Sequence, residues 1–459
     1  MKNHLSKYKF SKYNHKIALE GDLFLYNALS GGFCKVDADI KDILEKCDLT
    51  SNILEIRDLP QNIIDELIKG GFLLEKDIDE FKLIKSIHNV SRFSNNNSLN
   101  LTLLPTLGCN FRCTYCFEKE QNYPNTKMTK EVMDAIIKLI DERLNSGGNL
   151  GISWYGGEPL IHFDIVEELQ SRINEIAIAK NLNLKSSMVT NGYLLTKEVS
   201  DKLVNLGIKS VQITIDGPKK IHDQKRILVN GKGSFDKIIS NLIEINENLY
   251  ISIRVNIEKN NIDTIPEFLD FLNEIGICNK KNIAPYFAVV RDFSNKKGSL
   301  SDTCYTISDY SKEEIYLSKI AYEKGFDIGE RLTPNLSSCG AISPNMLLIE
   351  PDGTIQKCWN SVGDSKESVG HLIDTNIDSL MITKNKSEWY SWSSFEDEEC
   401  KNCKVLPLCM GGCPYYSINQ NEVYKNSNYR CVTGKFNLED TLKMIAYRHL
   451  NKKCQMERR

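Results

Sequence analysis

The chain concentrates its chemically reactive side chains in two cysteine clusters. It has 15 cysteines in 459 residues. A trio at Cys109, Cys113 and Cys116 has the spacing C-x3-C-x2-C, and seven more cysteines lie between Cys339 and Cys431. Because the cytosol keeps thiols reduced, tight clusters in a cytosolic chain indicate metal ligation or redox chemistry rather than disulfides.

The trio favours an iron–sulfur cluster. Three thiolates on one short loop can hold three corners of a cubane cluster and leave the fourth iron without a protein ligand. An iron with an open position is a substrate site. A zinc loop is the alternative, but structural zinc sites use four ligands, and no fourth Cys or His is close to this trio in the sequence.

Glycine and polar motifs follow the next three apolar runs of the sequence. They are Gly-Gly-Glu-Pro at 156–159, Thr-Asn-Gly at 190–192 and Gln-Ile-Thr-Ile-Asp-Gly-Pro at 212–218. Glycine lets backbone approach a ligand closely, and polar residues at strand ends can bind ribose and carboxylate groups. A glycine pair alone is usually a turn, but four motifs at successive strand ends favour a ligand site.

The Cys trio and these motifs, in this order, resemble the signature of the radical S-adenosylmethionine (SAM) enzymes. The resemblance implies that Cys109, Cys113 and Cys116 hold the catalytic cluster, whose open iron chelates the methionine of the cosubstrate. Reductive cleavage then gives a 5′-deoxyadenosyl radical that abstracts a substrate hydrogen. The residues assigned to SAM are Tyr115, Gly156, Gly157, Glu158, Pro159, Thr190, Asn191, Thr214, Asp216, Arg226 and Arg254. The two arginines are candidates for the methionine carboxylate, although a salt bridge explains each of them equally well.

The second cluster resembles the SPASM domain, a seven-cysteine extension of radical SAM enzymes that modify peptides or proteins. It implies two auxiliary clusters and therefore three 4Fe–4S clusters in total. A zinc ribbon is the alternative. By position, the resemblance gives an outer set of ligands, Cys400, Cys403, Cys409 and Cys431, and an inner set, Cys339, Cys358 and Cys413.

The inner set is one ligand short. Some relatives place a cysteine six residues after the first of the seven, and here that position is Asn345. Either a distant residue such as Cys278 or Cys304 completes the inner cluster, or one iron stays open to bind a substrate thiolate. We expect the open site, because leftover cysteines are usually inert packing.

Repeated strand and helix patterns must position these motifs. From Leu99 to about Asp327, apolar runs at 101–104, 151–155, 185–189, 210–215, 251–257 and 286–290 alternate with helical periodicity. Thr129 is an expected helix N-cap, and Ser311 with Glu314 is an expected capping box. Six such repeats predict a parallel sheet, either doubly wound or curled into a partial barrel, and the resemblance implies the partial (β/α)6 barrel.

The flanking regions are expected to form domains of their own. Residues 1–95 show a hairpin pattern around a Gly-Gly turn at 16–36, amphipathic segments at 39–47 and 60–69, and an apolar run at 72–74, which predict a winged-helix-like domain. The core is expected at 96–335. The last domain, 336–459, has shorter segments, so we expect metal clusters to hold it together.

Composition excludes several classes of protein. Hydrophobic residues make up 41% and charged residues 26%, which indicates a globular chain. The formal net charge of −3 gives no general attraction to nucleic acid or anionic membrane. No apolar window suits a signal peptide or a membrane span. We therefore expect a cytoplasmic enzyme with no nucleic-acid or membrane partner.

The winged-helix-like module resembles the leader-peptide recognition domain of peptide maturases of the sactipeptide and ranthipeptide type. This implies a precursor peptide as partner, a flavodoxin- or ferredoxin-type electron donor, and installation of a cross-link, most readily a cysteine thioether. A carbon–carbon cross-link or cyclophane is a further enzymatic possibility. The alternative is an anaerobic sulfatase maturase, which forms formylglycine. A zinc-stabilised peptide-binding scaffold is the non-enzyme alternative.

Overall fold

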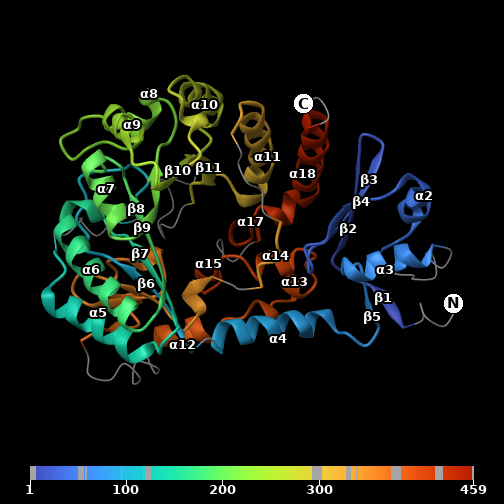
Figure 1. The fold of residues 1–459 in the computed structure, drawn as a ribbon, viewed down its shortest axis with the longest axis horizontal. Coiled ribbons are helices and arrows are strands. Elements are labelled where there is room, and N and C mark those ends of the chain that lie inside the picture. Colours follow the sequence, from blue (N-terminus) through green and yellow to red (C-terminus); the bar gives the residue numbers. More distant parts are fainter. Residues whose placement is uncertain are drawn as a thin grey trace.

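A computed structural model gives the arrangement of most of the chain. It describes residues 7–49, 56, 59–94, 96–116, 118, 126–291, 302–326, 332–336, 339–373, 384–418 and 427–456. Figure 1 shows three regions side by side: a barrel, the N-terminal region at the opposite end, and the C-terminal region between them. Within the described residues, no helix combines the length and apolar character that a membrane span requires.

Six parallel strands in chain order form the barrel sheet. Their order in the sheet is their order in the chain, from β6 to β11, and each pairs in parallel with the next. A doubly wound sheet would reverse its strand order at a switch point. The uninterrupted order therefore confirms the partial-barrel fold. The strands are β6 Ser98–Leu103, β7 Asn149–Trp154, β8 Asn183–Thr190, β9 Ile208–Thr214, β10 Tyr250–Ile257 and β11 Ile283–Val289.

Amphipathic helices cover the outside of this sheet (Figure 1). In the first of them the Thr129 hydroxyl accepts from the Val132 N–H at 3.3 Å, which confirms the expected N-cap, and Ile136 and Ile140 on its inner face are fully buried. The helices are α5 Lys130–Arg143, α6 Phe163–Ala179, α7 Lys197–Asn205, α8 Lys219–Lys225, α9 Phe235–Glu244, α10 Ile265–Glu274 and α11 Ile307–Glu323, with short 3-10 turns η3 Pro159–His162, η4 Ile262–Thr264 and η5 Ile277–Asn279.

The predicted capping box at the start of α11 is wrong. The helix begins five residues earlier, where the Thr306 hydroxyl accepts from the Asp309 N–H at 3.1 Å. Ser311 lies inside the helix and donates to the Ser308 carbonyl, and Glu314 accepts from Asn437 instead of capping. Thr306 satisfies the unpaired N–H groups of the first turn, so a second cap is not needed.

The C-terminal region extends the barrel sheet. Strand β12, Met346–Ile349, pairs in parallel with β6, and β13, Thr354–Gln356, and β14, Gly370–His371, follow it in antiparallel order. The remaining elements are mostly single turns. They are η6 Gly340–Ile342, η7 Trp359–Ser361, η8 Ser365–Glu367, α12 Lys384–Ser391, η10 Ser394–Glu396, α13 Glu398–Lys401, α14 Leu406–Cys409, α15 Pro414–Ile418 and α17 Ser427–Arg430.

One long helix departs from the expectation of short C-terminal segments. Helix α18 spans Gly434–Met456 and is kinked at Asn437. Its buried side chains Leu438 and Leu442 share a hydrophobic cluster with the N-terminal residues Ile17 and Phe24. Partners in a distant part of the chain therefore stabilise this helix, and local sequence pattern does not reveal them.

The N-terminal region contains the predicted hairpin, helices and strand. A three-stranded antiparallel sheet has the order β2-β3-β4, with the Gly31-Gly32 turn between β3 and β4. A separate pair joins β1 to β5. The elements are β1 Tyr8–Phe10, β2 Asn14–Leu19, β3 Asp22–Asn27, β4 Phe33–Lys35, α2 Ala38–Lys46, α3 Gln61–Lys69 and β5 Leu73–Glu75.

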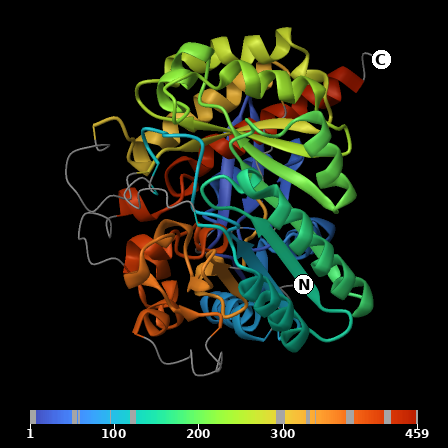
Figure 2. The same cartoon turned by 90° about the vertical axis from the view of Figure 1, so that its left-hand side faces the viewer.

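Helix α4, Glu80–Phe93, joins the N-terminal region to the other two. The buried Arg92 guanidinium donates to the carbonyls of Ile342, Trp389, Tyr390 and Trp392 in the C-terminal region, at 2.8–3.1 Å. Figure 2 shows the C-terminal region beside the first barrel strands, with the N-terminal region behind it. The N-terminal region is therefore packed on the C-terminal region as well as being linked to it by the chain.

Candidate active site

A cavity of about 380 Å³ opens at the carboxyl ends of the barrel strands. This is where ligands bind in parallel α/β sheets. The Cys trio, most of the SAM-assigned residues and several residues from the C-terminal region line it together. The lining residues are Cys109, Phe111, Cys113, Tyr115, Cys116, Glu118, Tyr155, Gly156, Gly157, Val189, Thr190, Asn191, Gln212, Thr214, Arg226, Arg254, Asn256, Val289, Val290, Arg291, Trp359 and Asn360.

Backbone hydrogen bonds hold the cysteine loop, residues 105–116, against the segment that follows α8. The Arg112 N–H donates to the Ile227 carbonyl at 2.7 Å, and the Thr114 N–H donates to the Lys225 carbonyl at 3.0 Å. In return, the Val229 N–H donates to the Asn110 carbonyl at 2.9 Å. These bonds place the cysteine loop, and with it the three thiols, at the cavity.

Gly157 is required by the cysteine loop. A Cβ atom at this position would overlap the carbonyl oxygens of Leu107 and Gly108. At Gly156, where φ is +126°, a Cβ would overlap the carbonyl oxygen of Thr106. The sequence interpretation placed the ligand next to these glycines, whereas the backbone they approach in the structure is that of the cysteine loop. Both glycines therefore fit this loop against the end of β7.

Glu158 connects two of the sequence motifs. Its fully buried carboxylate accepts from the Thr190 hydroxyl and the Asn191 N–H, each at 2.7 Å, and from the Leu160 N–H at 3.1 Å. Burial raises the pKa of Glu158, while these donors favour its ionised form. Since protein donors occupy both oxygens, Glu158 positions the strand-end motif Thr190-Asn191. Pro159, at the start of η3, is buried and does not line the cavity.

A polar network surrounds Tyr115. Its hydroxyl donates to Asp216 and accepts from Arg226 at 2.9 Å and from Asn256 at 3.1 Å. Burial lowers the pKa of Arg226, but the neighbouring Cys113 and Asp216 raise it well above its ordinary value overall. Oδ1 of Asp216 and Nε of Arg226 are buried without a partner among the described residues. These two atoms are unsatisfied polar groups beside the cavity, as expected for a site that takes a polar ligand.

The other SAM-assigned residues also lie at this end of the barrel. Thr214, at the end of β9, and Arg254, on β10, line the cavity. Arg254 Nε donates to Asn256 Oδ1 at 2.8 Å, which connects it to the Tyr115 network. Arg226 and Arg254 thus belong to one hydrogen-bonded network, and in the structure their hydrogen bonds run into this network instead of forming the surface salt bridges that the sequence left open.

Burial raises the pKa of two thiols of the trio, those of Cys109 and Cys113. Burial raises the pKa of Cys113 to about 11, against the opposing charge of Arg226. Burial, with the charge of Glu158, raises the pKa of Cys109 further. Metal binding deprotonates thiols outright, so iron bound here would convert these thiols to thiolate ligands.

Within each of the two sets expected from the sequence, some cysteines lie close enough to influence one another's pKa. In the inner set, Cys413 and Cys339 both add to the rise in the pKa of Cys358, which burial dominates. In the outer set, burial raises the pKa of Cys400 to about 12 and of Cys431 to about 11, and Cys409 adds to both rises. Members of each set therefore lie within electrostatic reach of one another. In the described ranges, no three His, Cys, Asp or Glu side chains are grouped as one metal ion requires.

Tyr155, Trp359 and Glu118 are among the cavity residues that were not singled out from the sequence. Tyr155 stacks on Trp359, with ring centroids 4.3 Å apart, and forms a wall of the cavity. Glu118 is buried beside Tyr155, and burial raises its pKa to about 7. Their positions in the sequence could have pointed to two of these residues, because Tyr155 directly precedes the Gly-Gly pair and Trp359 directly follows Cys358.

Comparison with known proteins identifies a family and several relatives. Residues 103–272 match the model of the Radical SAM superfamily. A cysteine-type anaerobic sulfatase-maturating enzyme of Clostridium perfringens is 27% identical, over 73% of this chain and 94% of that enzyme. The radical SAM cyclopropyl synthase TigE of Paramaledivibacter caminithermalis is 26% identical, over 88% of this chain and 89% of its own length.

Solved structures share the fold. Native anSMEcpe with bound AdoMet and the Kp18Cys peptide superimposes with a TM-score of 0.59 at 21% identity, covering 75% of this chain and 98% of its own. SuiB of Streptococcus suis bound to the precursor peptide SuiA superimposes with a TM-score of 0.53 at 16% identity, covering 90% of this chain and 97% of its own.

Proposed function

Since this chain is a radical SAM enzyme, we propose that it joins the sulfur of a cysteine to a carbon of another residue in a ribosomally made precursor peptide. The reaction removes one hydrogen from the acceptor carbon and one from the thiol, and forms a carbon–sulfur bond. The peptide would lose two electrons and two protons overall: one hydrogen atom would pass to the radical derived from SAM, the thiol proton to solvent, and the remaining electron to an iron–sulfur cluster.

The cavity suits the cofactors of this family. Cys109, Cys113 and Cys116 would hold the catalytic 4Fe–4S cluster, and the unsatisfied atoms of Asp216 and Arg226 would meet polar groups of SAM. The bound cosubstrate supplies the radical that takes the hydrogen. The residues of this chain orient the cosubstrate and exclude water. A flavodoxin- or ferredoxin-type protein would deliver the electron.

Two auxiliary clusters complete the proposal. The outer set, Cys400, Cys403, Cys409 and Cys431, would hold one 4Fe–4S cluster, and the inner set would hold the other. One support is that cysteines of the same set raise one another's pKa. Another is the position of Trp359, which directly follows the inner-set Cys358 and lines the cavity. The inner cluster would thus lie next to the substrate space.

One observation carries the preference for a peptide cross-linker over a sulfatase maturase. The cyclopropyl synthase TigE matches more of this chain, 88% of it, against 73% for the sulfatase-maturating enzyme. The solved structures differ in the same way: the superposition with SuiB covers 90% of this chain, and the superposition with anSMEcpe covers 75% of it. The additional matched length supports a substrate-recognition role for the region outside the barrel and the cysteine sets.

The edge strand β4 suits a leader peptide. Main-chain bonds of β4 to β3 include the Val36 N–H donating to the Leu23 carbonyl and the Asn27 N–H donating to the Gly32 carbonyl. Because side-chain and hydrogen-bond directions alternate along a strand, the N–H of Lys35 points away from β3. An extended peptide could add there as a further strand.

Substitution at Lys35 tests this recognition role. Lys35→Pro removes the outward N–H, removes the lysine side chain and fixes φ, whereas Lys35→Ala removes the side chain but keeps the N–H. We expect Lys35→Pro to weaken binding of the full precursor about 10-fold, the effect of one lost main-chain hydrogen bond. Lys35→Ala should bind as the wild type does. Equal affinity in both variants and in a precursor without its leader would contradict leader recognition at β4.

Deleting residues 1–95 would be a poorer test. Ile17, Phe24 and Tyr26 share a buried cluster with Leu406 and Leu438 of the C-terminal region. Truncation would expose that cluster and unsettle the cysteine sets, so loss of activity would not distinguish recognition from folding.

Formylglycine formation on a sulfatase peptide is the second candidate. It is favoured by the likeness to sulfatase-maturating enzymes over nearly the whole length of those enzymes. The two functions differ in the fate of the cysteine sulfur, which a thioether keeps and formylglycine loses. Mass spectrometry of a sulfatase-type peptide after anaerobic reaction with SAM and reductant separates them.

A further inference from the structure

A second cavity lies at the opposite end of the barrel sheet from the candidate active site. It has a volume of about 170 Å³ and lies between the helices α5 and α12 and the strands β6, β12 and β13. Ser98 and Leu99, the first residues of β6, line it, whereas the active-site cavity opens at the carboxyl ends of the strands. The two cavities share no lining residue, so a ligand in the second one would not touch SAM or the cysteine trio.

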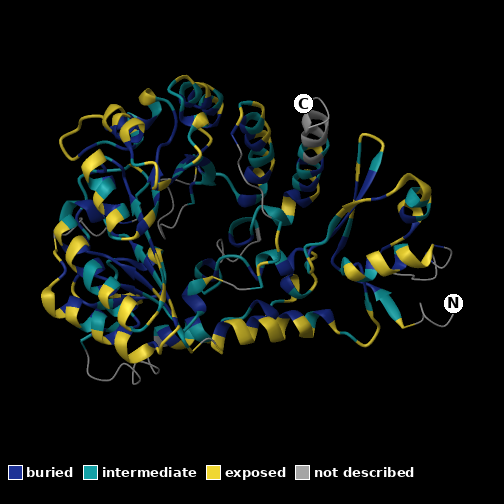
Figure 3. Cartoon of the chain, in the orientation of Figure 1, coloured by how far each residue is buried: buried dark blue, intermediate teal, exposed yellow. Residues whose placement is uncertain are grey.

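Apolar side chains form much of the wall of this cavity. Figure 3 shows the helices in this part of the molecule exposed on their outer faces, with buried residues on the sheet itself. The apolar residues come from the sheet, from α5 and from the segment before β14, and they include Leu99, Leu139, Leu347, Ile355 and Val369. A cavity of about 150 Å³ with such walls can hold benzene, a body of roughly six carbons. The wall therefore suits a compact hydrocarbon group.

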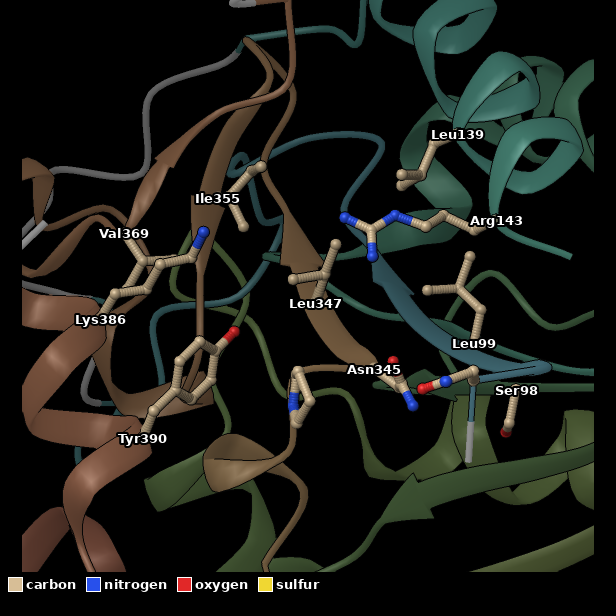
Figure 4. Close-up of a pocket in the computed structure, with 12 residues that line it drawn as sticks. Ser98, Leu99, Leu139, Arg143, Asn345, Leu347, Ile355, Val369, Lys386 and Tyr390 are labelled. Carbon is tan, nitrogen blue, oxygen red and sulfur yellow. The ribbon is translucent and has the colours of Figure 1, made fainter. Parts of the chain in front are cut away.

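Polar groups reach the same cavity from two sides. Figure 4 shows Arg143 entering from the α5 side, and Lys386 and Tyr390 entering from the α12 side. Lys386 is buried, and it lies four residues before Tyr390, on the same face of α12. The hydroxyl of Tyr390 makes no hydrogen bond to any residue that the structure describes. This hydroxyl is therefore a donor that a ligand could use.

The surroundings of Tyr390 are positively charged. Burial raises the pKa of Tyr390, while the charges of Arg143 and Arg92 act to lower it, so both guanidinium groups lie within electrostatic reach of this ring. The ammonium nitrogen of Lys357 lies 5.2 Å from the centre of the same ring. No Asp or Glu is among the described residues that line the cavity. Positive charges gathered at a partly apolar cavity favour an anionic ligand there.

Hydrogen bonds outside the cavity hold α12 and β13 in place. Arg92 of α4 donates to three carbonyls of residues 389–392, at 2.8–3.1 Å. Lys357, which directly follows β13, donates to two carbonyls of residues 343–346. The side chains around the cavity are therefore positioned before a ligand binds, which lowers the cost of binding. Because β13 ends two residues before Cys358, a ligand would also stabilise the segment that leads to the inner set.

We propose that this cavity binds a carboxylate that is joined to a compact apolar group. The carboxylate would accept from the Tyr390 hydroxyl and pair with Arg143 and Lys386, while the apolar group would lie against Leu347 and Ile355. A bare phosphate or sulfate ion suits the site less well, because it would leave the apolar wall without a contact. The C-terminal residue of a peptide and a free organic acid share this chemistry. The site goes beyond the cross-linking reaction and does not depend on it.

The test is calorimetric titration of the full-length, reconstituted enzyme with benzoate and with benzamide, its neutral counterpart of the same shape. We expect benzoate to bind at least about 10-fold more tightly, because hydrogen bonds to a charged group are the stronger ones. Tyr390→Phe, which removes only the hydroxyl, should weaken benzoate binding about 10-fold, and Lys386→Met should weaken it further. Tyr316→Phe, at an exposed position of α11, is the matched control and should bind benzoate as the wild type does.

Three results would overturn the proposal. Equal affinity for benzoate and benzamide would show an apolar cavity with no anion site. Benzoate binding that Tyr390→Phe and Lys386→Met both leave unchanged would place the ligand elsewhere, and no binding of benzoate in the millimolar range would leave the cavity without this role. Competition separates the two sources of the carboxylate: a precursor peptide displaces benzoate, and its C-terminal amide does not, only if the peptide terminus is the ligand. The wild-type comparison decides the existence of the site even where Lys386→Met does not fold.

Discussion

The barrel cavity and the C-terminal cysteine region position their thiols in different ways. In the barrel, six paired strands and a backbone ladder to residues 225–229 hold the cysteine loop. In the C-terminal region, the outer-set cysteines lie on or beside helices of four or five residues, α13, α14 and α17 among them. Isolated helices of that length are not stable in water. The second region therefore needs stabilisation from outside its own secondary structure.

That stabilisation comes from distant parts of the chain and, in our account, from the clusters. Arg92 of α4 binds four C-terminal carbonyls, and the N-terminal β-sheet shares a hydrophobic cluster with α14 and α18. Metal binding adds folding free energy where a core is too small to supply it. We therefore expect the barrel to fold without iron, and we expect the C-terminal region to need iron in order to fold.

Removing the catalytic thiols should have the largest effect on activity. With Cys109, Cys113 and Cys116 all changed to Ala, we expect release of 5′-deoxyadenosine to fall to background, at least about 10³-fold, because the open iron is lost. Auxiliary iron should remain, since the other cysteine sets are separate. The exposed Cys34→Ala is the control. If the triple variant released 5′-deoxyadenosine as fast as the wild type, the assignment of this loop to the catalytic cluster would be wrong.

Iron removal should separate the two regions. After anaerobic chelation, we expect amides in residues 394–418 to lose at least about 100-fold of their protection in hydrogen exchange, while strands β6 to β10 change less than about threefold. The strand ladders of the barrel need no metal. Equal loss in both regions would show that one cooperative unit depends on iron, contrary to the comparison.

Gly157→Ala should damage the barrel site locally. Its Cβ would overlap two backbone carbonyls of the cysteine loop, so we expect loss of about four irons and destabilisation of about 2–4 kcal/mol. Gly147→Ala is the steric control, because a Cβ there meets no neighbouring atom and adds only the strain of the positive φ, +76°. It should cost about 1 kcal/mol and no iron. Similar iron contents in both variants would mean that the loop can move away.

The contact between the N-terminal and C-terminal regions should weaken at low pH, with the smallest effect. Burial and the charge of Lys404 lower the pKa of His15 to about 4, below its ordinary value of 6.5. The unfolded state takes up the proton first, so stability is full above the ordinary pKa and is lost as pH falls toward 4. We expect a loss of about 2 kcal/mol by about pH 5 in denaturant titrations. His15→Gln should flatten this dependence, and an unchanged slope would refute the role of His15.

The sequence predicted the barrel well because its signals are local. Strand runs, the Thr129 cap and the order of the motifs all lie within short segments, and each appears where expected. It failed where a distant partner decides the structure. Helix α18 is stabilised by Ile17 and Phe24, and the start of α11 depends on Thr306 rather than on the capping pattern at Ser311.

Site prediction shows the same division. Residues inside motifs, such as Tyr115 and Asp216, come together at the cavity as expected. Trp359 has no motif that links it to the barrel, and its stacking on Tyr155 at the cavity exists only through the packing of the C-terminal region on the barrel. Separation of about 200 positions along the chain leaves no periodicity or spacing that could reveal such a pair.

The most direct test of the central claim follows one hydrogen and one sulfur through a single reaction. The enzyme, SAM and a reductant are incubated anaerobically with a cysteine-containing precursor peptide that is deuterated at carbon, and both products are analysed by mass spectrometry. We predict deuterium in 5′-deoxyadenosine and a peptide that has lost two hydrogens, kept its sulfur and become resistant to thiol alkylation. Loss of sulfur with formation of an aldehyde, or 5′-deoxyadenosine without deuterium, would contradict the account.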